Sequence, residues 1–240
     1  MTAEEKTVLA KALDLAEDYL RDGYARSRGE YVFAEDPPEN VAVSLPPQPA
    51  DSLEALKEDI RRCTACPLHT VRGKPLIGDG AGGPLVLILG DAPSKEDEEA
   101  GTPFAGPAGE LLDRMLGAIA LSREANCYLT HRIKCRPPED GSSHAPEAAS
   151  LAAAACAPFL KRELALLKPV LILTLESSAG CSPKTPELSG IPCFSTYHPA
   201  LIRSDERLKR PAWEQLKVLS ATLTGLDRDY ADALRISRRG

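Results

Sequence analysis

Residues 85–93 read LVLILGDAP, five apolar side chains in a row that stop at Gly90. A short unbroken apolar run of this kind is typical of a parallel strand that is buried on both faces. Three more strands are expected on similar grounds, at residues 128–133, 170–175 and 193–197. The small and polar residues after the first run then lie at the carboxyl end of a strand, where parallel sheets bind their ligands.

Helical periodicity fills the intervals between these strands. Apolar side chains three and four positions apart predict helices at 108–119 and 211–223, and a third at 146–167 that is interrupted at Pro158. Because strands that alternate with helices form βαβ units, the sequence predicts an α/β fold with a mostly parallel sheet covered on both faces.

The two ends of the chain differ from this central part. Residues 1–33 begin with an amphipathic helical pattern, and residues 34–50 hold five prolines, which predicts a helical appendage joined by a Pro-rich linker. A helix that starts near Asp51 opens the folded domain, expected at 51–225. Residues 226–240 are expected to be a C-terminal tail, of which 235–240 are frayed and basic.

The composition excludes several classes of protein. The chain has 240 residues, of which 43% are hydrophobic and 27% charged, so it is neither wholly disordered nor fibrous. No apolar run approaches the ~20 residues of a membrane span, and the charged N-terminus does not resemble an export signal. The net charge of −6 argues against binding polyanions through bulk charge, although a local basic patch is compatible with it. We therefore expect a cytoplasmic protein without a membrane partner.

Seven cysteines without an export signal favour metal binding over disulfides. Cys63 and Cys66 form a C-x-x-C pair, but no second pair follows, as a zinc ribbon would require. Cys135 and Cys156 stand alone, so the set is compatible with four thiolates around an iron–sulfur cluster. From spacing alone, a zinc site, an iron–sulfur cluster and no metal all stay open.

Five separated motifs give the chain a resemblance to a known family. They are 90–93 (GDAP), 103–109 (PFAGPAG), 134–138 (KCRPP), 156–160 (CAPFL) and 197–199 (YHP). Over about residues 53–223 they resemble the family 4 uracil-DNA glycosylases, the iron–sulfur branch of that superfamily. The resemblance implies a three-layer α/β/α sandwich on a short, mostly parallel four-stranded sheet. It also implies a 4Fe-4S cluster on Cys63, Cys66, Cys135 and Cys156.

The same resemblance implies roles for individual residues. Phe104 would stack on an extruded uracil, His198 would donate to the base oxygen, and Asp91 would position water or stabilise a cationic sugar. The base pocket would be lined by Gly90, Asp91, Ala92, Phe104, His131 and His198. The DNA would be gripped by Lys134, Arg136, Arg203, Lys209 and Arg210. The implied function is a repair glycosylase that hydrolyses the N-glycosidic bond of uracil in DNA and leaves an abasic site.

The main departure from the family pattern is His131. The family has an asparagine there, whose amide reads the base edge with one donor and one acceptor, whereas the two imidazole nitrogens lie on opposite sides of a ring. An imidazole that titrates near neutrality would also make base discrimination depend on pH. Asp91 stands where glutamate is usual, and the loop 136–155 is longer than expected.

Three functions therefore stay open. The chain is a uracil glycosylase slowed by His131, a glycosylase for another deaminated base, or a non-catalytic iron–sulfur protein that binds DNA. We expect a monomer at the nucleoid, with the N-terminal helix free to dock a repair or replication partner.

Overall fold

The computed structural model describes residues 6, 51–138, 145–176, 188 and 190–237. The chain divides between Gln48 and Pro49, and all of these residues except Lys6 belong to the second unit. The expected domain start near Asp51 stays a prediction. The expected appendage at 1–33 and linker at 34–50 lie, apart from Lys6, outside the described residues.

Five strands form one sheet in the order β1-β3-β2-β4-β5. Neighbouring strands from β3 to β5 are parallel, and β1 pairs antiparallel with β3. Their bounds are β1 Asp79–Gly80, β2 Val86–Gly90, β3 Cys127–His131, β4 Leu171–Glu176 and β5 Cys193–Tyr197. The α/β prediction and its four parallel strands are confirmed. The fifth strand was not expected because two residues carry no periodicity.

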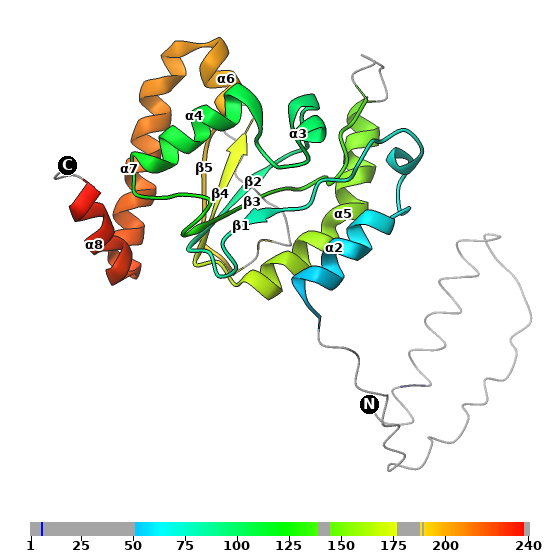
Figure 1. Ribbon diagram of the computed structural model, residues 1–240, viewed down its shortest axis with the longest axis horizontal. Helices are drawn as coiled ribbons and strands as arrows, with labels where there is room; N and C mark the ends of the chain where they lie inside the picture. Colours follow the sequence, from blue (N-terminus) through cyan, green and yellow to red (C-terminus); the bar gives the residue numbers. More distant parts are fainter. Residues whose placement is uncertain (1–5, 7–50, 139–144, 177–187, 189, 238–240) are drawn as a thin grey trace, which may run out of the picture. The chain divides into compact units, whose positions relative to one another are not determined.

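Helices cover both faces of the sheet, which confirms the three-layer sandwich (Figure 1). One face packs against α4 (Gly106–Gly117), α7 (Lys209–Leu226) and α8 (Arg228–Ser237). The other packs against α5 (Ala145–Leu167), with α2 (Leu53–Arg62) beside it. Alternate side chains of β2 pack on opposite faces of the sheet. Val86 and Ile88 belong to the core under α4, α7 and α8, and Leu87 and Leu89 to the core under α5.

The remaining elements are short and lie near the carboxyl ends of the strands. They are the helices α3 (Lys95–Ala100) and α6 (Pro199–Ser204) and the 3-10 turns η1 (Pro67–Thr70) and η3 (Glu206–Leu208). Among the described residues, no helix is both long and apolar enough to cross a membrane.

Two expectations about helices are wrong. Pro158 does not interrupt α5, which runs on because Leu160, Leu164 and Leu167 are buried in the core beyond the proline. Residues 228–237 are not a tail, because they form α8, which inserts Tyr230 into the core, where the Tyr230 hydroxyl donates to the Ile119 carbonyl at 2.7 Å. In both places tertiary packing outweighs the local signal.

Candidate functional site

The site lies where the parallel strands end. Gly90 closes β2 and pairs in register with His131, which closes β3. A Cβ atom on Gly90 would lie 2.8 Å from ring atoms of both His131 and Phe104, so only glycine lets the two rings approach this strand end. Gly90, expected to line the base pocket, therefore makes room for the two rings at the end of β2.

Phe104 brings the two histidines together. Its ring stacks on His131, with 4.5 Å between ring centroids and an interplanar angle of 26°, and lies 6.0 Å from the ring of His198. Only 4% of Phe104 is exposed, and its backbone has a φ of 53°, in the left-handed region that non-glycine residues rarely adopt. Strained backbone of this kind concentrates at functional sites.

His131 is buried and neutral. Only 2% of the residue is exposed, and burial, followed by the charge of Lys134, lowers the pKa of its imidazole to about 3. The ring therefore does not titrate near neutrality, which corrects the expected pH dependence. Its Nδ1 has no hydrogen-bond partner among the described residues, while its Nε2 lies 3.6 Å from a carboxylate oxygen of Asp97.

Asp97 joins the site from the charged run 95–99, a pattern typical of a solvated face from which only Asp97 or Glu98 would be expected to touch the site. It is 3% exposed and caps α3 together with Ser94, whose backbone N–H it accepts at 3.0 Å. Its other oxygen accepts the Ala105 N–H at 2.7 Å, beside Phe104. The available signal was the capping pattern, Ser94 followed three residues later by an acid.

His198 is held as a neutral donor. Its Nδ1 accepts the backbone N–H of Ala200 at 3.2 Å, at the start of α6. Partial burial lowers the pKa of His198. In the neutral ring the proton therefore belongs to Nε2, the nitrogen on the far side from the helix.

A pocket opens beside Phe104 and His198. Its empty volume is about 590 Å³ with the open mouth included. Ala92 and Arg203 also line it. Asp91 is not among the lining residues, because its side chain is 59% exposed and lies 3.7 Å from Arg132.

One expected DNA contact is wrong. Lys134 is 2% exposed, and its Nζ donates to Glu163 at 2.6 Å and to Thr130 at 2.7 Å, so it cannot reach a phosphate. Two others engage acids, Arg136 with Glu98 at 2.8 Å and Lys209 with Glu206 at 2.6 Å. Arg203 and Arg210 are exposed.

The four expected cluster ligands line one cavity. Cys63, Cys66, Cys135 and Cys156 surround an empty volume of about 290 Å³ at the end of α2, beside α5. Within the described part of the chain, no three His, Cys, Asp or Glu side chains lie close enough to share a single metal ion.

Arg72 was not anticipated in this cavity. Its guanidinium donates to the Cys135 sulfur at 3.2 Å and to the Cys63 carbonyl at 2.8 Å, and so joins two of the expected ligand segments. Burial raises the pKa of the Cys135 and Cys156 thiols, an effect that a bound metal ion would reverse.

Comparison with known proteins gives a consistent result. A family model described as the uracil DNA glycosylase superfamily matches residues 77–217. A type-4 uracil-DNA glycosylase of Pyrobaculum aerophilum is 37% identical over 123 residues, 51% of this chain and 60% of the relative. Those of Thermotoga maritima and Saccharolobus solfataricus are 33% and 34% identical and are covered to 63% and 56% of their lengths, against 53% and 52% of this chain. The chain thus spans about 60% of the length of these relatives.

Proposed function

The chain belongs to the uracil DNA glycosylase superfamily, and on that premise we propose that it excises uracil from DNA by hydrolysing the N-glycosidic bond. The observation that carries this function is the pocket beside Phe104 and His198 at the carboxyl ends of the strands. An aromatic face and a neutral hydrogen-bond donor are the two groups that an extruded pyrimidine needs.

Phe104 would offset part of the cost of extruding the base. A base inside a duplex cannot be reached, and flipping it out costs a few kcal/mol of stacking and pairing. Stacking on an aromatic ring returns about 1–3 kcal/mol per base. Because Phe104 is held by its backbone before any base arrives, little of that gain would be lost in ordering the ring.

His198 would stabilise the departing base. Cleavage of the glycosidic bond leaves negative charge on the base, and a fixed donor aimed at the base oxygen lowers the energy of that anion. Nδ1 of His198 is engaged by Ala200, so Nε2 would supply this bond. Asp91, at the end of β2, would place its carboxylate near the positive charge that develops on the sugar.

His131 supports a second candidate within the same reaction class. Its neutral ring has a buried Nδ1 without a partner among the described residues, and the carboxylate of Asp97 near Nε2 favours the proton on that nitrogen. Nδ1 would then be an acceptor. Uracil and hypoxanthine carry a ring N–H that cytosine and adenine lack, so the second candidate is a glycosylase that accepts several deaminated bases.

The four cysteines are proposed to hold a 4Fe-4S cluster, which when bound would tie the ligand loops to α5. Cys63 and Cys66 lie at the end of α2, Cys135 follows β3, and Cys156 lies on α5. Anaerobically purified protein should contain four irons per chain, by the stoichiometry of the cluster. Replacing Cys135 with serine should abolish iron and loosen the fold, whereas the same change at Cys193, outside the cavity, should leave both intact.

DNA would lie across the mouth of the pocket. Arg203 lines that mouth, and Lys209 and Arg210 follow at the start of α7. Such contacts with phosphates make binding sensitive to salt without giving it sequence preference. Activity on DNA would also keep the protein at the nucleoid.

The direct test is a panel of oligonucleotides that each carry one altered base. Purified protein is incubated with strands that contain uracil, hypoxanthine, thymine or cytosine, and abasic sites are revealed by alkaline cleavage. The proposed function predicts cleavage at uracil and none at cytosine. Cleavage at hypoxanthine as well would establish the second candidate. Binding without cleavage of any strand would leave only a non-catalytic DNA-binding protein.

A further inference from the structure

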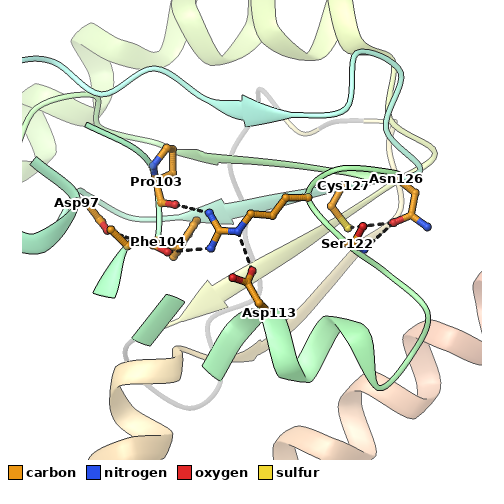
Figure 2. Close-up of polar contacts among 9 residues, drawn as sticks. Asp97, Pro103, Phe104, Asp113, Ser122, Asn126 and Cys127 are labelled. Carbon is orange, nitrogen blue, oxygen red and sulfur yellow. Dashed lines mark hydrogen bonds and ion pairs between the residues drawn. The ribbon is translucent and has the colours of Figure 1, made fainter. Parts of the chain in front are cut away.

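The side chain of Arg123 forms hydrogen bonds with the backbone around Phe104. Arg123 lies in the loop between α4 and β3, with 18% of its side chain exposed. Its two terminal nitrogens donate to the carbonyls of Pro103 and Phe104, each at 2.8 Å. Its Nε donates to Asp113 at 2.7 Å (Figure 2). The guanidinium therefore links the backbone of Pro103 and Phe104 to Asp113 on α4.

The loop that carries Arg123 is itself braced. The Asn126 side chain accepts the backbone N–H of Ser122 at 2.8 Å and donates to the Ala120 carbonyl at 3.1 Å. Figure 2 shows Asn126 and Ser122 at one end of this chain of contacts, and Pro103 and Phe104 at the other. These hydrogen bonds stabilise the loop before β3 and so help to position the Arg123 side chain.

Phe104 needs such support because its backbone is strained. With a φ of 53° it lies in the left-handed region, which L-residues other than glycine avoid. Its carbonyl also presses on the first turn of α4, where a Cβ atom on Gly109 would lie only 1.7 Å from the Phe104 oxygen. Asp97 holds the following N–H, that of Ala105, at 2.7 Å. Arg123 donates to the crowded Phe104 carbonyl and to that of Pro103.

We propose that Arg123 is a positioning residue, which acts through the backbone of Phe104 to hold the aromatic ring ready for the extruded base. This role rests on the proposed function, in which Phe104 stacks on that base. Arg123 does not line the pocket, so it would contribute to base recognition without touching the base. Lysine in its place would keep the charge but has a single nitrogen, which cannot serve both carbonyls and Asp113.

The test separates recognition of the base from recognition of the DNA backbone. One probe is a single strand with 2′-fluoro-2′-deoxyuridine, whose fluorine disfavours the cationic sugar and so prevents cleavage. The other is the same strand with a tetrahydrofuran abasic analogue, which has no base to stack. The dissociation constant for the abasic strand divided by that for the uracil strand measures what the base adds to binding.

Arg123→Lys should lower this ratio by about tenfold, within the range that a lost aromatic stack costs. The matched control is Arg162→Lys, since Arg162 also makes three charged hydrogen bonds, to Asp51 and Asp59, on the α2 and α5 side of the sheet. That variant should keep the parent ratio. Melting temperatures of both variants check that the fold survives, and Arg123→Gln gives a second, charge-free measurement.

A double-mutant cycle shows whether Arg123 acts through Phe104. Phe104→Leu should lower the ratio by itself, and adding Arg123→Lys should lower it no further. If Arg123→Lys keeps the parent ratio, or reduces it equally in both backgrounds, the positioning role is wrong while the proposed function stands. If the parent itself does not prefer the uracil strand, the proposed function fails and the role of Arg123 falls with it.

Discussion

The imidazole of His131 takes up room beside Phe104 that the shorter side chain of asparagine would leave partly free. The two rings are stacked with 4.5 Å between their centroids, so His131 covers one face of Phe104. The ring also offers one nitrogen to a base edge where an amide offers a donor and an acceptor. If the proposed function holds, the size of the His131 imidazole and its single available nitrogen would both weaken the recognition of uracil.

His131→Asn should raise the rate of uracil excision. One lost or bent buried hydrogen bond costs about 1–3 kcal/mol, which corresponds to roughly ten- to a hundredfold in rate. Single-turnover kinetics on a uracil-containing strand measure the change, and His69→Asn, at an exposed position by Cys66, serves as the control. A variant no faster than the parent would show that His131 does not limit excision.

Acid should weaken the fold through the same residue. The pKa of His131 is about 3 in the folded chain and 6.5 in an ordinary environment, so between these values only the unfolded chain binds the proton. Its contribution to the unfolding free energy is complete above pH 6.5 and is lost as the pH falls, by up to about 1.4 kcal/mol per unit. Urea titrations at several pH values should show a shallower decline for His131→Asn. Parallel declines would contradict the burial of a neutral ring.

At the scale of elements, the buried pair of Lys134 and Glu163 joins the segment after β3 to α5. Both side chains are at most 2% exposed, and Cys135 and Cys156 lie on the two segments that the pair connects. Removing one partner leaves a buried charge alone, whereas replacing both by apolar groups of similar size is often tolerated.

Lys134→Met should therefore lower the unfolding free energy by about 3–5 kcal/mol, and Lys134→Met with Glu163→Leu should restore most of it. Arg162→Met, which removes two more exposed ion pairs, should cost about 1 kcal/mol or less. Chemical denaturation of the four proteins measures these differences. A double variant as unstable as the single one would mean that packing, and not charge, accounts for the loss.

At the scale of the whole molecule, much of the architecture could be predicted because its signals are local. The apolar runs of β2 and β4 are typical of buried strands, and the helical intervals between them imply parallel order. Two-residue β1 gives no periodic signal, and α8 is a charge-rich segment whose burial depends on Tyr230 reaching the core.

The candidate site was predictable only in part, for the same reason. The glycine at the end of β2 and the cysteine spacing are visible along the chain. The burial of Lys134 depends on Glu163, 29 residues away, and the support of Phe104 depends on Arg123, 19 residues away. Pairings at such separations are set by the fold and leave no pattern in the local sequence.

The central claim is that the pocket beside Phe104 excises uracil with His198 as the donor to the departing base. The most direct measurement is the single-turnover rate of uracil release by the parent and by His198→Ala, with binding to the uncleavable strand measured in parallel. The parent should release uracil, and the variant should be slower by about 10²–10³-fold while it still binds that strand. A parent that releases no uracil, or a variant as fast as the parent, would contradict the claim.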